Sequence, residues 1–203
     1  MKRYRSPREV LADVERVLAA RPSATAHASP LDEIVEQLHD ARHYFWIGIY
    51  LVVGEQVVRQ AFRGPVPPCH AFAFGVGNVG TTGQSGILKV IPDVSQDPTY
   101  SMCFLETKSE IVVPIKLGGK VLGVIDVESD RENAFGKTDR VLLEEVADRL
   151  ARFLTKSGRY LLRHARESAT ASNSPVRAYP ASAEKAVKSS GGRRAAAGAG
   201  TRS

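Results

Sequence analysis

The sequence predicts one α+β domain, a mainly antiparallel sheet flanked by N- and C-terminal helices. Helical periodicity of apolar residues at both ends, and β-branched and aromatic segments separated by glycine turns between them, support this fold class. The length of 203 residues suits one core, and 43% hydrophobic with 25% charged residues is a globular composition. We expect a helix and linker over residues 1–29, the domain over 30–157, and a helix extension followed by a disordered basic tail over 158–203.

Three segments have the spacing of amphipathic helices. Residues 7–20 carry Val10 and Val14 on one face, which needs a partner surface, and a linker rich in Pro, Ser and Ala follows over residues 21–30. Residues 31–41 form the second helix. The third helix runs over 137–154 and continues toward residue 166.

Six segments have the composition of strands. Two tight turns, at Gly54-Glu55 and Gly118-Gly119, join neighbouring strands into hairpins. A glycine-punctuated stretch over residues 75–82 is expected to be a loop whose backbone approaches a ligand closely. The predicted strands are Tyr44–Val53, Gln56–Arg63, Cys69–Phe74, Leu88–Ile91, Glu110–Leu117 and Lys120–Glu128.

The distribution of charge excludes several classes of protein. The net charge is +6, but residues 156–203 hold ten Lys and Arg against two acidic residues, so the basicity belongs to the tail. That tail lacks the apolar residues needed to offset ordering entropy, and at most a weak contact with nucleic acid is expected. The longest apolar run, residues 44–53, is half of a membrane span, and no signal-peptide core is present. We therefore expect a cytoplasmic protein.

Alternation along the last predicted strands indicates an acidic pocket. Asp126 and Glu128 are two residues apart on one strand and so point to the same face. Glu110 joins them if the register of the hairpin agrees. Acidic residues at strand ends ordinarily lie in water, whereas Asp126 stands within an apolar strand and is harder to explain that way. Such a pocket would attract an ammonium group.

A family resemblance rests on the same region. Ser109-Glu110-Ile111-Val112-Val113-Pro114-Ile115, then the segment from Gly119 to Ser129, then Phe135 and Asp139, resemble the second half of a GAF domain. Within that superfamily the chain is most similar to the free methionine-(R)-sulfoxide reductases, over roughly residues 45–153. The resemblance implies a GAF-like fold and a small-molecule ligand, expected to be free methionine-(R)-sulfoxide.

The resemblance also implies roles for particular residues. Cys103 lies where the family has its catalytic cysteine, and Cys69 where it has a second one that resolves the sulfenic acid to a disulfide. The implied substrate-binding residues are Trp46, Glu110, Asp126 and Glu128. No metal or cofactor is expected. Recycling would need an external thiol reductant such as a thioredoxin-like partner, and a homodimer through the terminal helices is a further expectation.

A second hypothesis, a non-catalytic GAF sensor or regulatory module in signalling, stays open. Val79 replaces a loop cysteine of the family, and Phe104 to Thr107 replace a shorter, smaller run after the nucleophile. A cyclic-nucleotide ligand is disfavoured because Arg140 stands where that class has glutamate. A free cysteine is often only a small buried hydrophobe, so Cys103 alone does not decide between enzyme and sensor.

Overall fold

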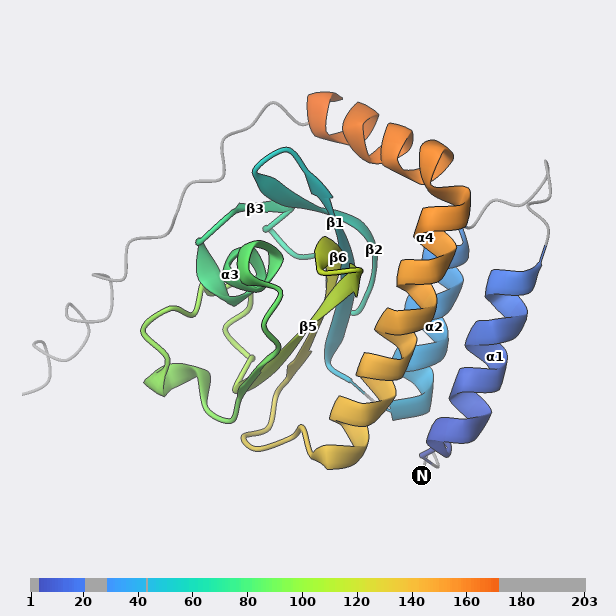
Figure 1. Cartoon of the computed structure of the whole chain (residues 1–203). Coiled ribbons are helices and arrows are strands. Elements are labelled where there is room, and N and C mark those ends of the chain that lie inside the picture. The colour runs from blue at the N-terminus through green and yellow to red at the C-terminus, as the bar shows by residue number, and fades with distance from the viewer. Residues whose placement is uncertain (1–3, 21–28, 43, 172–203) are drawn as a thin grey trace, which may run out of the picture.

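A six-stranded antiparallel sheet lies in the middle of the molecule, with helices on one face and a short helix and loops on the other (Figure 1). The computed structural model describes residues 4–20, 29–42 and 44–171, with the side chains of the last helix described to residue 155. The strand order is β3-β2-β1-β6-β5-β4. The strands are β1 Trp46–Val53, β2 Gln56–Arg63, β3 Ala71–Ala73, β4 Lys89–Ile91, β5 Ser109–Leu117 and β6 Lys120–Ser129.

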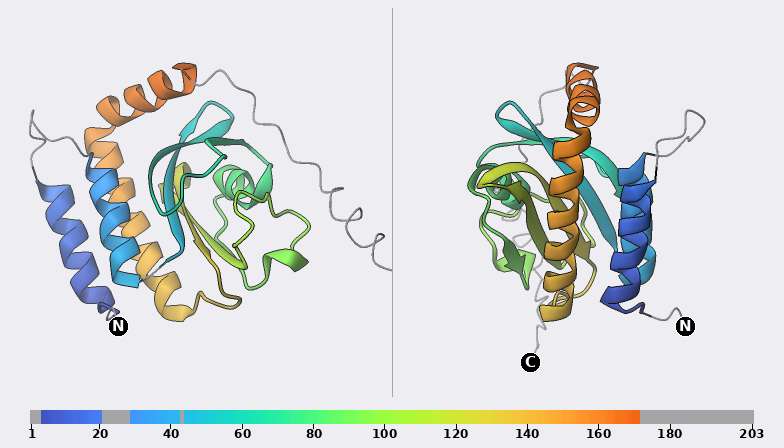
Figure 2. Two further views of the ribbon diagram at one scale, coloured as in Figure 1. Left: turned by 180° about the vertical axis from the view of Figure 1, so that it is seen from behind. Right: turned by 45° about the vertical axis from the view of Figure 1, so that its right-hand side comes forward.

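Helices α2 Pro30–Arg42 and α4 Lys137–Ala171 cover one face of the sheet, and α1 Pro7–Ala19 packs on the outer side of these two helices (Figure 2). Helix α1 begins at Pro7 because Ser6 and Glu9 form a capping box, in which each side chain bonds the other's backbone N–H. Its apolar face packs against α2 and α4, which leaves Val10 and Val14 fully buried. The partner surface that this helix needs therefore lies within the same chain.

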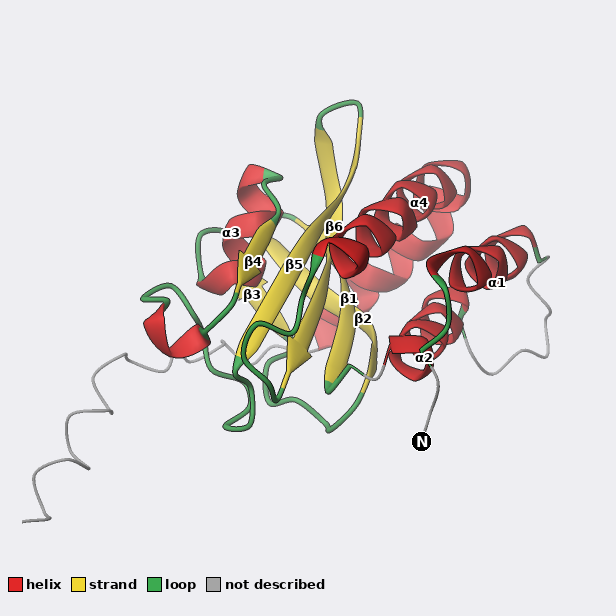
Figure 3. Ribbon diagram, turned by 90° about the horizontal axis from the view of Figure 1, so that it is seen from below, coloured by secondary structure: helices red, strands yellow, loops and turns green. Residues whose placement is uncertain are grey.

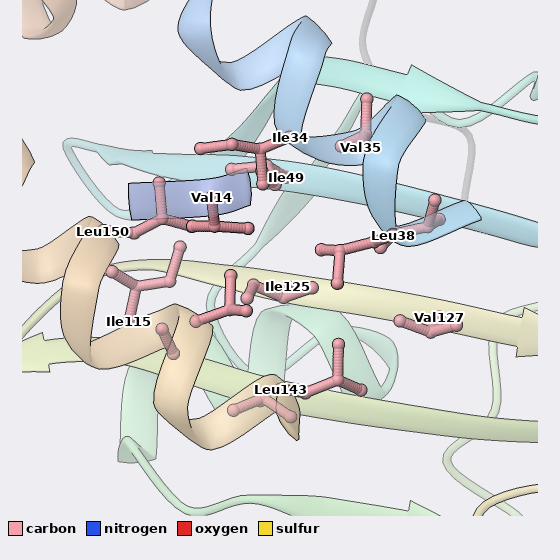
Figure 4. Close-up of a cluster of buried hydrophobic side chains, with 14 of the residues drawn as sticks. Val14, Ile34, Val35, Leu38, Ile49, Ile115, Ile125, Val127, Leu143 and Leu150 are labelled. Carbon is pink, nitrogen blue, oxygen red and sulfur yellow. The ribbon is translucent and has the colours of Figure 1, made fainter. Parts of the chain in front are cut away.

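The larger core lies between these helices and the sheet (Figure 4). Alternate residues of β1 and β6, among them Ile49, Ile125 and Val127, point toward the helices and are completely buried. Ile34 and Leu38 from α2 and Leu143 and Leu150 from α4 meet them from the other side. The residues of this core are all hydrophobic, and the acidic residues of β5 and β6 point to the opposite face.

The opposite face is covered by helix α3, Gly77–Ser85, and by the loops on either side of it (Figure 3). The prediction of a loop over residues 75–82 is wrong, because most of that stretch is helical. Gly75 and Gly77 have positive φ and turn the chain into the helix, and a side chain at Gly80 would overlap the backbone of Ala73. These glycines let a helix pack closely on the sheet.

The other predicted elements are confirmed, with small changes at their ends. The third strand is shortened to Ala71–Ala73, and a short 3₁₀ turn, Val94–Gln96, interrupts the loop before β5. Of the predicted linker over residues 21–30, Pro30 begins helix α2 and residues 21–28 lie outside the described residues, as do residues 172–203 of the predicted tail. Among the helices that the structure describes, none has the length and hydropathy to cross a membrane.

Candidate functional site

Three carboxyl groups come together on the face of the sheet that α3 covers. The register of β5 and β6 places Glu110 directly opposite Glu128. Asp126 lies two residues before Glu128 on β6, on the same face. The condition set for Glu110, agreement of the hairpin register, is therefore met. All three side chains are at least 97% buried, so none of them is a solvated strand-end residue.

Burial raises the pKa of all three carboxyl groups. Removal from water is the main cause for each, and repulsion from the neighbouring carboxylates adds to it for Asp126 and Glu128. The pKa of Glu110 rises to about 7 and that of Glu128 to about 8, and that of Asp126 rises well above its ordinary value. The three groups therefore share protons near neutral pH, and a cationic ligand is the natural replacement for those protons.

The hydrogen bonds of the three carboxyl groups are unequal. Glu110 Oε2 accepts a bond of 2.7 Å from the Asn78 amide, and Glu128 accepts one from the Thr107 hydroxyl. Asp126 Oδ1 is buried and has no hydrogen-bond partner among the described residues. A buried oxygen without a partner costs free energy, so Asp126 is the group most in need of a ligand donor.

Trp46 forms the aromatic wall of this site. On β1 it lies opposite Glu128, and its neighbour on the same face, Gly48, lies opposite Asp126. The six-membered ring of Trp46 extends over Gly48, where any side chain would overlap it. The indole therefore lies beside Asp126 and Glu128. Its Nε1 is buried without a partner among the described residues.

The two cysteines are joined in a disulfide. The Cα atoms of Cys69 and Cys103 are 6.0 Å apart, and both residues are partly exposed. Phe104, the residue after Cys103, packs on Trp46 with a centroid distance of 5.8 Å and edge-on to Phe45 at 5.6 Å. The aromatic contact, the disulfide and the hydrogen bond of Thr107 to Glu128 together fix the Cys103 loop beside the carboxyl groups.

All six predicted site residues thus occupy one region of the molecule. Sequence reasoning missed two others. Asn78 on α3 and Lys89 on β4 are joined to Glu110 through hydrogen bonds. Because the glycine-rich segment was expected to be a loop, nothing in its sequence indicated that Asn78 would point at the sheet. Val79, in place of the family's loop cysteine, packs among the aromatic residues.

The structure also has a cavity away from this site, and its described residues form no metal-binding group. A cavity of about 390 Å³ opens between the start of α1 and the loop after β6, and its lining includes Tyr4, Arg42, Arg131 and Asp139 but none of the six predicted residues. Within residues 4–20, 29–42 and 44–171, no group of three or more His, Cys, Asp or Glu side chains is arranged to hold a metal ion.

Known proteins are similar to this chain in sequence and in fold. The GAF domain family model matches residues 29–154. The chain is 33% identical to GAF domain-containing protein A of Dictyostelium discoideum over 138 residues, which are 68% of this chain and 85% of that protein. It is 37% identical to the free methionine-R-sulfoxide reductase of Saccharomyces cerevisiae over 106 residues, 50% of this chain and 58% of that protein.

A solved structure of a protein with the same name as one of these sequence relatives has a similar fold. The X-ray structure of free methionine-R-sulfoxide reductase from Neisseria meningitidis in complex with its substrate superposes with a TM-score of 0.66. It is 29% identical, and the superposition covers 83% of this chain and 99% of that one. With the match over residues 29–154 and the shared fold, the chain belongs to the GAF domain family.

Proposed function

We propose that this chain is a reductase of free methionine-(R)-sulfoxide that uses Cys103 as its nucleophile. One observation carries the proposal: Cys69 and Cys103 are joined in a disulfide, and the segment after Cys103 contacts both the Trp46 indole, through Phe104, and the buried carboxyl group of Glu128, through Thr107. Three buried carboxyl groups beside a pair of cysteines suit a substrate with an ammonium group and a reducible sulfur. Relatives named as free methionine-R-sulfoxide reductases support it.

The carboxyl groups would bind the substrate and supply protons. An ammonium group between Glu110 and Asp126 gives the unpartnered Asp126 Oδ1 its missing donor. The raised pKa values of Glu110, Asp126 and Glu128 leave protons in the cluster at neutral pH. One of these protons is available to the sulfoxide oxygen. Protonation there weakens the sulfur–oxygen bond before attack.

The redox step needs only the two cysteines. The Cys103 thiolate attacks the sulfur of the protonated sulfoxide and forms a sulfur–sulfur bond. The hydroxyl group then passes from the substrate sulfur to the Cys103 sulfur as the sulfur–oxygen bond of the substrate and the new sulfur–sulfur bond break, so methionine leaves and Cys103 ends as a sulfenic acid. The sulfoxide gains two electrons and Cys103 loses two. The Cys69 thiol then attacks the sulfenic sulfur, a disulfide forms, and water leaves. A dithiol protein of the thioredoxin type returns the disulfide to two thiols by exchange.

The second candidate is a ligand sensor without turnover, and one observation favours it. Phe104, which follows Cys103 directly, packs on Trp46. It belongs to the run of larger residues after Cys103 that distinguishes this chain from the family pattern. If Phe104 stays there after reduction, the sulfoxide sulfur would not reach Cys103. A sensor would bind its ligand and leave it unchanged.

The experiment incubates the reduced full chain with free methionine-(R)-sulfoxide and excess dithiothreitol and measures methionine by chromatography. We expect methionine to form. Cys103→Ser should abolish its formation. Cys69→Ser should still produce up to one equivalent in a single turnover without added thiol. The (S) epimer is the matched substrate control and should give none.

Two results would overturn the enzyme proposal. No methionine from the reduced wild-type chain would do so, as would equal turnover by Cys103→Ser. Calorimetric binding of the sulfoxide in the absence of turnover would then favour the sensor.

A further inference from the structure

Asn78 is the centre of a buried hydrogen-bond network behind the carboxyl groups. Its side chain is 1% exposed, and both of its polar atoms are used. The amide nitrogen lies 2.7 Å from Glu110 Oε2 and 2.8 Å from Asp97 Oδ2. The amide oxygen lies 2.9 Å from Lys89 Nζ and 2.9 Å from Thr99 Oγ1.

The chemistry of the partners determines the orientation of this amide. An ammonium group only donates, so the atom facing Lys89 is the oxygen. An ionised carboxylate only accepts, so the two N–H groups face Glu110 and Asp97. The Asn78 amide therefore lies between Lys89 and Glu110. The negative end of its dipole, the oxygen, faces the Lys89 ammonium, and the positive end, the N–H group, faces the Glu110 carboxylate. An N–H bond to a carboxylate favours its ionised form.

The other two carboxyl groups have no amide or ammonium group bonded to them in the part of the chain that the structure describes. Glu128 receives a bond from the neutral hydroxyl of Thr107, and Asp126 Oδ1 has no partner among the described residues. Tyr100 also interacts with Glu128, and the hydrogen bond between Asp126 and Glu110 raises the pKa of Asp126. Mutual repulsion disfavours three negative charges in one buried site. Of the three carboxyl groups, Glu110, with the amide and the lysine behind it, is therefore the one whose ionised form is best stabilised.

We propose that Asn78, polarised by Lys89, is a positioning residue that holds Glu110 as the anion of the three-carboxyl cluster. The proton shared by the cluster then resides on Asp126 and Glu128. In the reductase proposed above, on which this consequence rests, Glu110 receives the substrate ammonium and the other two groups hold the proton for the sulfoxide oxygen. The pKa of Glu110, raised to about 7, is consistent with this order because that of Glu128 rises to about 8.

Several other groups also act on Glu110 and enter the test. Asp126 and Glu128 face it from β6, and Asp97 faces it from the loop after the 3₁₀ turn. Tyr50 from β1 and Tyr100 from the loop before β5 also interact with it. These groups are unchanged in the variants below, so a shift in the titration of Glu110 is assigned to the Asn78 and Lys89 contacts.

The test measures side-chain carboxyl ¹³C shifts of the full-length oxidised protein against pH, with the Glu110 signal identified by its loss in Glu110→Gln. In Asn78→Leu we expect the midpoint of Glu110 to rise by about one pH unit or more. In Lys89→Met, which keeps the amide, we expect a smaller rise. Gln84→Leu removes an exposed amide from the same helix and should leave the midpoint unchanged.

An unchanged Glu110 midpoint in Asn78→Leu overturns the proposal, even if that variant is less stable. If Asn78→Leu does not fold, Lys89→Met decides, and an unchanged midpoint there overturns it. This titration needs no turnover, so it stands or fails separately from the reductase activity. With active enzyme, Asn78→Leu should also raise KM about tenfold at pH 7 and move the acid limb of kcat/KM to higher pH.

Discussion

Glu110 and Glu128 are direct cross-strand partners on β5 and β6, and both carboxyl groups are at least 97% buried. Two like charges opposite each other in a sheet repel. The arrangement is therefore tolerated only while protons or a cation occupy the cluster. Its consequences extend to stability and to ligand binding.

The first prediction concerns the pH dependence of stability. The pKa values of Glu110 and Glu128 are about 7 and about 8 in the folded chain, against 4.5 when unfolded. The folded state thus binds more protons between about pH 4.5 and 8. The free energy of unfolding should therefore be highest below pH 4.5 for these two groups and fall by roughly a few kcal/mol as the pH rises to 8.

Urea denaturation of the oxidised protein at several pH values measures this slope. Glu128→Gln should flatten it, because one titrating group is removed. Glu106→Gln, at an exposed position in the preceding loop, is the control and should keep the wild-type slope. Stability that rises from pH 5 to 8 in the wild type would contradict the assignment of raised pKa values.

The second prediction concerns the disulfide. Cys69 and Cys103 are separated by 34 residues, and closing a loop of that length restricts the unfolded chain. The oxidised form should be more stable than the reduced form by about 3 to 4 kcal/mol. Denaturation with and without dithiothreitol measures the difference. The double variant Cys69→Ser, Cys103→Ser should not respond to dithiothreitol, and a response there would mean that the reductant acts elsewhere.

The third prediction concerns the glycine beneath Trp46. A methyl group at Gly48 would overlap the indole ring, so Gly48→Ala must displace it. We expect a loss of stability of about 1 to 3 kcal/mol. Fluorescence should report a changed environment for Trp46, since the chain has one tryptophan. In Gly136→Ala, where the added methyl group meets no atom within 4 Å, the emission should match that of the wild type.

The fourth prediction concerns the contact between α2 and α4. Arg42 donates two hydrogen bonds to Asp139, at 3.1 and 2.8 Å, and the Tyr44 hydroxyl donates a third at 3.2 Å. Because these side chains are mostly buried, Asp139→Asn should lower the free energy of unfolding by about 1 to 3 kcal/mol. Thermal or urea unfolding measures the loss.

The exposed pair Arg140 and Glu144 is the matched control on the same helix. Glu144→Gln should change the free energy of unfolding by about 0.5 kcal/mol or less. Equal losses in Asp139→Asn and Glu144→Gln would show that burial of the Asp139 contacts adds nothing.

The sequence alone determined the fold class, most element boundaries and the position of the acidic residues of the last two strands. The reason is physical: alternation with period two assigns each strand residue to a face, and glycine pairs such as Gly118-Gly119 mark turns by their positive φ. The same alternation placed Asp126 and Glu128 together and made Glu110 their neighbour subject to one condition, the register.

The tertiary structure decided what depends on contacts between distant segments. The register of β5 and β6 placed Glu110 opposite Glu128, and burial from α3 and the loops raised their pKa values. Asn78 became part of the site only because the glycine-rich stretch forms a helix packed on the sheet. Local sequence does not encode that packing, since a glycine permits both a loop and a close helix contact, and only the opposing surface selects between them.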